Sequence, residues 1–159
     1  MSKKSKKPSG TKAERLLEET TFYVDDCLGK GVAHTLRASG WKVEWHRDHF
    51  DRDGVLDIEI FTFLAPHHWV MLTKDKGLRK NLHEVKRIVE CNCRVFSLSN
   101  GKMNSEQMSN IFLSNARGIG RFLKNYPAPF VAYFQKDRIE LLDVMVERIA
   151  NAATGKTKT

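Results

Sequence analysis

The chain has 159 residues, of which 41% are hydrophobic and 29% are charged, and this length and composition suit a single globular domain with a buried core. No apolar run approaches the roughly 18 to 20 residues of a membrane-spanning helix, and no apolar segment follows the basic N-terminus. The sequence therefore predicts no membrane segment and no secretory signal. Three cysteines at these spacings do not form a disulfide framework, which favours a reducing, cytoplasmic setting.

The net charge of +8 is concentrated at the two ends of the chain. Five lysines and no acidic residue fall within residues 1–12, and two more lysines fall within the last five residues. The remainder holds 20 basic and 19 acidic side chains, so the folded body is nearly neutral. We predict disordered basic tails at 1–11 and 154–159 around one folded domain at 12–153. Such tails can hold nucleic acid non-specifically or serve only as solubilising ends.

The first half of the chain alternates helical and extended patterns. Residues 12–19 predict a short helix, and residues 21–25 are rich in the β-branched and aromatic residues typical of a strand. A helical stripe of apolar residues follows over 28–40, and strict alternation over 41–46 predicts a second strand. The segment 51–68 is ambiguous, although the acidic residues at its start favour a helix N-terminus.

The second half continues this alternation. The predicted elements are a strand at 69–73, a helix at 81–92, a strand at 94–99, a long helix at 104–127, a hairpin at 130–143 with its turn near Lys136 and Asp137, and a closing helix at about 142–153. Strands that alternate with helices favour an α/β domain built around a mainly parallel sheet.

Two of the predicted strands end on acidic residues. Asp25 and Asp26 follow the first strand, and Asp75 follows "WVMLT". Because neighbouring parallel strands lie about 4.8 Å apart and their carboxyl ends share one edge, Asp25 and Asp75 could bind one cation. Oxygen ligands of this kind suit Mg²⁺ or Mn²⁺.

A third acidic ligand is expected from the segment "DRDGVLDIE". On a helix, Asp57 and Glu59 point about 200° apart, so only one of them can face the site. Four basic residues surround or follow Asp75 and could hold an anionic substrate near it: Lys74, Lys76, Arg79 and Lys80.

The stretches "FYVDDCLGKGVAHTLRASGWKV", "LDIEI" and "WVMLTKDKGLRK" together resemble the PIN-like domains of VapC-type toxins, in particular a shorter branch with "VD..LG" after the first strand and "LTKDK" after the third. The resemblance extends over roughly residues 22–142, and "PAPFVAYFQKDRIELL" is similar to the bend and closing strands of that branch. It implies a three-layer α/β fold with a mainly parallel central sheet.

The same resemblance implies a ribonuclease that uses Mg²⁺ or Mn²⁺ to hydrolyse RNA phosphodiesters. The family's acidic positions fall on Asp25, Asp57 and Asp75. A further aspartate of the better-studied members has no clear counterpart, and Glu59, Asp26 and Asn100 are the candidates to replace it. The implied partners are RNA, a cognate antitoxin protein and a second copy of the chain in a homodimer.

Other interpretations of these residues remain open. Asp25 and Asp26 could cap the following helix, Asp75 could form a salt bridge in a turn, and the basic residues after it could be a solvated helix face. The corresponding functional alternatives are a PIN-like module that binds RNA or a protein without cleavage, and a subunit held by its partner.

Overall fold

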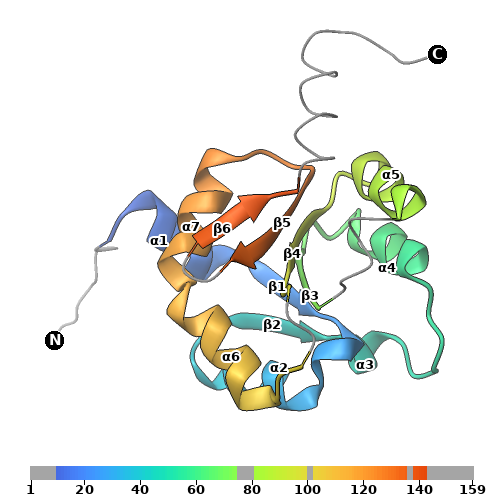
Figure 1. The fold of residues 1–159 in the computed structure, drawn as a ribbon, viewed down its shortest axis with the longest axis horizontal. Helices are drawn as coiled ribbons and strands as arrows, with labels where there is room; N and C mark the ends of the chain where they lie inside the picture. Colours follow the sequence, from blue (N-terminus) through green and yellow to red (C-terminus); the bar gives the residue numbers. More distant parts are fainter. Residues whose placement is uncertain (1–9, 75–80, 100–101, 136–137, 143–159) are drawn as a thin grey trace, which may run out of the picture.

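The computed structural model describes residues 10–74, 81–99, 102–135 and 138–142. At its centre is a six-stranded sheet with the order β2-β1-β3-β4-β5-β6 (Figure 1). Neighbouring strands are parallel except β5 and β6, which form an antiparallel hairpin. The strands are β1 (Thr21–Val24), β2 (Lys42–Trp45), β3 (Val70–Thr73), β4 (Arg94–Ser97), β5 (Phe130–Gln135) and β6 (Arg138–Leu141).

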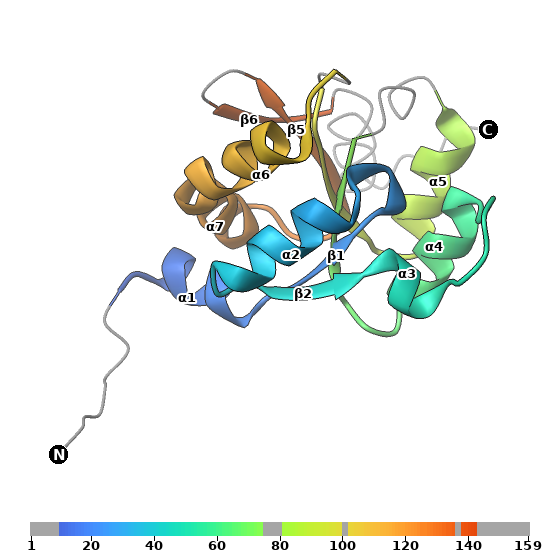
Figure 2. The same ribbon diagram turned by 90° about the horizontal axis from the view of Figure 1, so that it is seen from below.

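Helices cover both faces of the sheet, so that the domain has three layers (Figure 2). The side chains of α2, α6 and α7 pack on one face, and those of α4 and α5 pack on the other. The helices are α1 (Lys12–Glu19), α2 (Lys30–Ala38), α3 (His46–His49), α4 (Asp57–Leu64), α5 (Leu82–Glu90), α6 (Ser105–Ser114) and α7 (Ala116–Asn125), with one 3₁₀ turn at η1 (Asp26–Leu28). None of these helices is long and apolar enough to cross a membrane.

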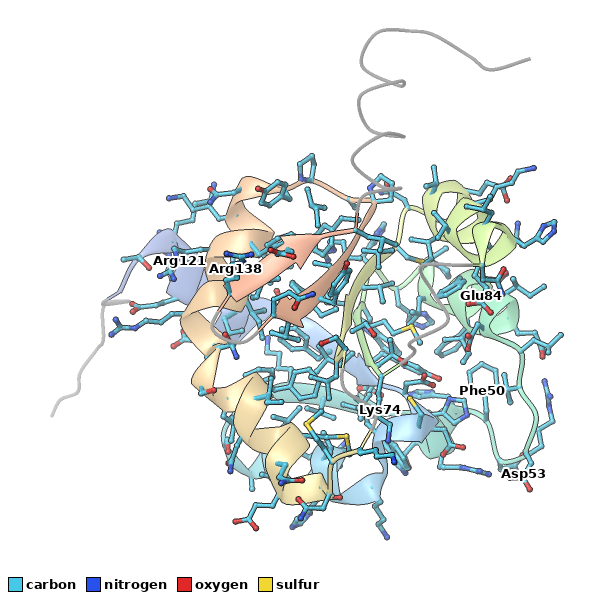
Figure 3. The ribbon with its side chains drawn as sticks, viewed as in Figure 1. Phe50, Asp53, Lys74, Glu84, Arg121 and Arg138 are labelled. Carbon is cyan, nitrogen blue, oxygen red and sulfur yellow. The ribbon has the colours of Figure 1, made fainter. Side chains whose placement is uncertain are left out.

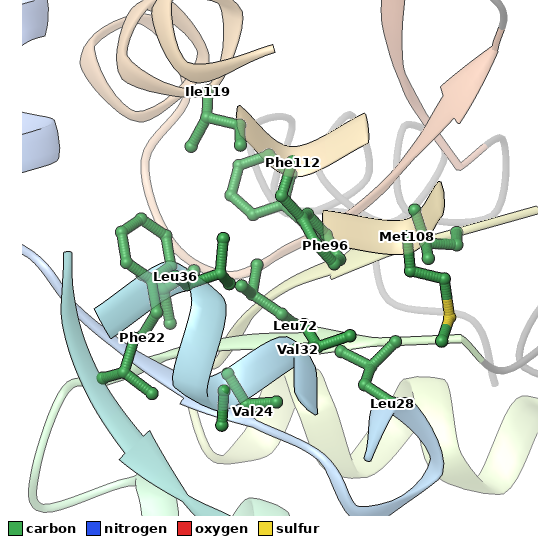
Figure 4. Packing of buried hydrophobic residues seen from close by; sticks show 14 of the residues in the cluster. Phe22, Val24, Leu28, Val32, Leu36, Leu72, Phe96, Met108, Phe112 and Ile119 are labelled. Carbon is green, nitrogen blue, oxygen red and sulfur yellow. The ribbon is translucent and has the colours of Figure 1, made fainter. Parts of the chain in front are cut away.

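The strands in the middle of the sheet are buried on both faces. In β1, Phe22 and Val24 face the layer of α2, α6 and α7 (Figure 4). Tyr23 lies between them in the strand and faces α4 and α5. In β3, Leu72 faces α2, α6 and α7, and Met71 faces α4 and α5. This double burial explains why the strands read as nearly continuous apolar runs in the sequence.

The predicted α/β class with a mainly parallel sheet is confirmed, and each predicted strand is present. The ambiguous segment 51–68 contains α4, in agreement with its acidic start. The predicted 41–46 strand ends at Trp45, because His46 already begins the short helix α3. Several predicted features lie outside the described residues: Lys136 and Asp137, residues 1–9 of the N-terminal tail, the whole C-terminal tail and nearly all of the expected closing helix.

The prediction of one long helix over 104–127 is wrong, because the segment forms two helices that meet at Asn115. Asn115 has φ −102° and ψ 15°, and its side-chain amide donates to the Ile111 carbonyl at 2.8 Å. A polar side chain that bonds to the backbone in this way competes with continuation of the helix. The apolar spacing still holds across the break, since Met108, Phe112 and Phe122 are all buried in the core.

Helix α1 packs closely on α7 at a glycine. A Cβ atom added at Gly120 would lie 2.5 Å from the carbonyl oxygen of Ala13, a backbone atom that cannot turn away. We therefore expect Gly120→Ala to lower the free energy of unfolding by about 1–3 kcal/mol, measured by urea denaturation, despite the better helix propensity of alanine.

Gly118 provides the matched control on the same helix. A Cβ atom there would meet only Ile139 Cδ1 at 3.4 Å, which is an ordinary contact. Gly118→Ala should leave stability unchanged or raise it by up to about 1 kcal/mol. Equal effects of the two substitutions would contradict the close packing of α1 on α7.

Candidate active site

The strand order reverses between β1 and β3. From β1 the chain passes through α2, on one face of the sheet, to reach β2, and then through α4, on the other face, to reach β3. Open α/β sheets bind ligands at the carboxyl ends of the strands at such a reversal. Asp25 directly follows β1 at this point, and its backbone N–H donates to the Leu72 carbonyl at 3.0 Å, so it lies level with Thr73 at the end of β3.

The Asp25 carboxylate is buried and held by three donors. Thr73 Oγ1 donates to Oδ2 at 2.7 Å, Cys27 Sγ donates to the same oxygen at 3.4 Å, and the Asp26 N–H donates to Oδ1 at 2.8 Å. The bond from the Asp26 N–H makes Asp25 the N-cap of η1, which is the capping role that the sequence left open for Asp25. A carboxylate has about four acceptor positions, so the donors among the described residues leave one position on Oδ1 for another ligand.

Cys27 supports this carboxylate as a neutral thiol. The residue is exposed at the surface, but its sulfur faces inward, 3.3 Å from Thr73 Oγ1. Burial first, and then the negative charge of Asp25, raises the pKa of the Cys27 thiol to about 12. The thiol is therefore protonated at neutral pH, which lets it donate to Asp25 and makes it a poor ligand for a soft metal.

Asp57 is the first residue of α4, and its charge acts on the same buried region as Asp25. Burial, followed by the charges of Asp25, Asp26 and Asp57, raises the pKa of the Tyr23 hydroxyl. Three carboxylates thus lie within electrostatic reach of one side chain on β1. The charges of Asp57 and Asp25 therefore act on one shared side chain, and the assignment of these two residues as metal ligands stays a prediction.

Asp26 and Glu59, the two acidic residues considered as replacements for the missing family aspartate, both form ion pairs with arginines. Asp26 forms a two-bond ion pair with Arg47, with Nε–Oδ1 and Nη2–Oδ2 distances of 2.9 Å each. Glu59 accepts from Arg52 at 2.7 Å and from the Leu56 N–H at 3.1 Å, and these two bonds lower its pKa. Glu59 therefore caps α4.

Lys74 is the one predicted RNA-binding residue that the structure describes. It is half-buried and directly follows β3 at the carboxyl edge of the sheet (Figure 3). Asp75, Lys76, Arg79 and Lys80 lie outside the described residues, as does Asn100.

A buried hydrogen bond between Tyr23 and His46 was not foreseen from the sequence. The Tyr23 hydroxyl lies 2.5 Å from Nδ1 of His46, and His46 is only 3% exposed. Burial lowers the pKa of His46, although the charges of Asp25 and Asp26 act in the opposite direction. The imidazole is therefore held mainly in its neutral form behind the candidate site.

This burial predicts a pH-dependent stability. An unfolded histidine binds a proton below its ordinary pKa of 6.5, whereas folded His46 resists protonation. The stability that the neutral His46 contributes to the folded state is complete above pH 6.5 and is lost as the pH falls below that value. Urea denaturation at pH 7.5 and 5.5 should show a smaller pH-dependent loss of stability for His46→Gln than for the wild type, and equal losses would contradict the neutral, buried state.

Two further residues gain significance from the fold. Arg47 binds Asp26 and also donates to Asp53 at 2.8 Å. The second residue, Glu84, lies half-buried in the first turn of α5 (Figure 3). Because α5 follows the carboxyl end of β3, Glu84 comes from an element that begins at the edge where Asp25 lies. Its position three residues after Asn81, which caps α5, is the only signal in the sequence, and it marks a helix start and nothing more.

The described side chains at this edge offer mainly oxygen. The carboxylates of Asp25 and Asp57 and the hydroxyl of Thr73 are of the type that Mg²⁺ and Mn²⁺ prefer, and the neutral thiol of Cys27 does not disturb that preference. Within the residues that the structure describes, no three His, Cys, Asp or Glu side chains are grouped closely enough to hold a metal ion. A complete metal site would need a ligand such as Asp75, which follows Lys74.

A comparison with protein families identifies the class. The model of the PIN like domain matches residues 20–100, which include β1, α4 and β3 as well as the carboxyl edge described above. The chain therefore belongs to the PIN-like domain family, and the predicted family is confirmed.

A curated protein is also similar to this chain in sequence. The chain is 25% identical over 114 residues to Putative ribonuclease VapC45 of Mycobacterium tuberculosis (strain ATCC 25618 / H37Rv), an alignment that covers 69% of this chain and 82% of the relative. No solved structure gives a significant match.

Proposed function

We propose that the chain is a Mg²⁺- or Mn²⁺-dependent endoribonuclease and the toxin of a toxin–antitoxin pair, with RNA as substrate and a cognate antitoxin as protein partner. The observation that carries the proposal is the buried Asp25, fixed by Thr73 and Cys27 at the reversal of the strand order. Family membership and the name of the mycobacterial relative support it. Cytoplasmic location and homodimer formation belong to the same proposal.

In this mechanism, Asp25, Asp57 and Asp75 would hold the metal, with Glu84 as a further candidate ligand. A bound Mg²⁺ or Mn²⁺ would lower the pKa of the attacking water and stabilise the charge that develops on phosphate. Thr73 and Cys27 hold the Asp25 carboxylate in one orientation, so little reorganisation is needed when substrate arrives. Lys74, Lys76, Arg79 and Lys80 would bind the RNA phosphates that the acidic residues alone would repel.

Removal of the metal tests this proposal. We expect single-stranded RNA to be cleaved in Mg²⁺, to remain intact in excess EDTA, and to be cleaved again after Mn²⁺ is added. Gel analysis of an end-labelled RNA measures all three conditions. Cleavage that continues in EDTA at an undiminished rate would overturn the metal-dependent mechanism.

A PIN-like module that binds RNA or a partner protein without cleavage is the second candidate. It is favoured by the ion pairs that engage Asp26 and Glu59, because these leave fewer acidic side chains for a metal. RNA binding that weakens with salt, without cleavage in Mg²⁺ or Mn²⁺, would support this alternative.

A further inference from the structure

We propose that the groove between α7 and β6 is a second RNA-binding surface, which holds the phosphate backbone of a single strand outside the candidate active site. The choice of RNA as the ligand rests on the proposed function. The groove has a volume of about 450 Å³ and lies on the side of the molecule where Arg121 and Arg138 are found (Figure 3).

The groove is basic. Arg117 and Arg121 are exposed and stand one turn apart on α7, and Arg138 of β6 lines the same groove. Arg138 pairs with Glu140, with an Nε–Oε2 distance of 2.7 Å. Across the described part of the chain, Arg117 and Arg121 form no salt bridge within 4.0 Å, and no described carboxylate lines the groove.

A neighbouring groove extends this basic surface. It has a volume of about 260 Å³ and lies between α1 and α7, and it shares Arg117 and Arg121 while adding Lys124. Glu14 of α1 also lines it, so among the described lining residues three are basic and one is acidic. Helix α7 therefore forms a ridge of positive charge with a hollow on each side. The folded body has almost as many acidic as basic residues, so this concentration is a local feature of α7.

The chemistry of the groove suits a nucleic-acid strand. Arginine side chains bind phosphate through two parallel hydrogen bonds, and the rise between Arg117 and Arg121 is about 6 Å, a step that two neighbouring phosphates can match. Asn125 adds an amide on the same stripe of the helix. Tyr126 is 39% exposed, and its ring stacks on Phe122 with a centroid separation of 4.3 Å, which provides an aromatic surface of the kind that bases stack on.

The sheet connects this groove to the candidate site. Arg138 pairs with Gln135 at the end of β5, which is the same edge of the sheet that carries Asp25. Strand β6 is four positions from β1, a distance of about 19 Å at the usual strand spacing. An RNA strand bound at Asp25 must therefore extend several nucleotides to reach the groove, so the groove should contribute only to the binding of longer RNA.

Binding of a short and a long RNA can distinguish the groove from the active site. In EDTA, to prevent metal-dependent cleavage, fluorescence anisotropy would compare a 3-nucleotide RNA, which is too short to span about 19 Å, with a 20-nucleotide RNA. We expect Arg117→Ala/Arg121→Ala to weaken binding of the longer RNA about tenfold and to reduce its salt dependence by about 1.4 in the slope of log affinity against log salt, the value for two phosphate contacts on a single strand. Binding of the shorter RNA should change by less than about twofold.

The matched control removes the same charge elsewhere. Lys42 on β2 and Lys86 on α5 are both exposed, and neither lines the groove. Lys42→Ala/Lys86→Ala should change binding of the longer RNA by less than about twofold. If this control weakens binding as much as the arginine variant, general charge explains the effect and the groove assignment is overturned.

The aromatic contact has its own test. Tyr126→Ala should weaken binding of the longer RNA about fivefold or more, whereas Tyr126→Phe, which keeps the ring, should bind as the wild type does. Wild-type affinity in both the Tyr126→Ala and the arginine variants would overturn the groove while leaving the proposed function intact. A wild-type protein that neither binds nor cleaves RNA would overturn both, and arginine-dependent binding of an oligoglutamate peptide in its place would identify an acidic protein segment as the ligand.

Discussion

Asp25→Asn is expected to reduce metal-dependent RNA cleavage by a factor on the order of 10² to 10³, with little change in stability. The substitution removes the negative charge that would bind the metal but keeps the shape of the side chain. The asparagine oxygen can still accept from the Asp26 N–H, and its amide group can donate to Thr73 Oγ1, since a hydroxyl is both a donor and an acceptor. Only the weaker bond from the Cys27 thiol is lost. Initial cleavage rates in saturating Mg²⁺, together with urea denaturation, measure the two effects.

Asp26→Asn is the matched control, because it removes the same charge one residue away. Its carboxylate is 41% exposed and paired with Arg47, so its loss should lower the cleavage rate by no more than a few-fold. An Asp25→Asn protein that cleaves RNA as fast as the Asp26→Asn protein would remove Asp25 from the proposed site.

The sequence was informative about Asp25 because its signal is local. A run of β-branched and aromatic residues that stops at an acidic residue predicts both a strand and the edge where it ends. The double burial of β1 and β3 strengthens that signal, because every residue from Phe22 to Val24 is apolar or aromatic. The same reasoning predicted the alternating α/β architecture, which depends on the order of elements and not on side-chain detail.

The features that sequence reasoning missed depend on contacts between distant segments. Tyr23 and His46 are 23 positions apart, and nothing in "WKVEWH" indicates that its last residue leaves the strand and turns inward to the hydroxyl. Arg47 neutralises Asp26 for the same reason, from an element that the sequence did not predict. The break at Asn115 was hidden because the apolar spacing continues through it and the competing hydrogen bond is made by one side chain.

Asp57 and Glu59 offer the second decisive comparison, because the sequence allowed either one as the third ligand. The charge of Asp57 reaches the buried Tyr23 hydroxyl together with that of Asp25, whereas both oxygens of Glu59 accept hydrogen bonds at the start of α4. We expect Asp57→Asn to lower the metal-dependent cleavage rate at least about thirtyfold, somewhat less than Asp25→Asn because its position on a helix end is less enclosed. The concentration of Mg²⁺ needed for half-maximal cleavage should rise in the same variant.

Glu59→Gln should leave the cleavage rate within about threefold of the wild type, because the glutamine oxygen can still accept from the Leu56 N–H and only the charge toward Arg52 is lost. Its effect should instead be a small decrease in thermal stability, since the pKa of Glu59 is lowered by those same bonds. The reverse outcome, in which Glu59→Gln abolishes cleavage and Asp57→Asn does not, would mean that Glu59 leaves Arg52 when substrate and metal bind, and it would assign the third ligand to Glu59.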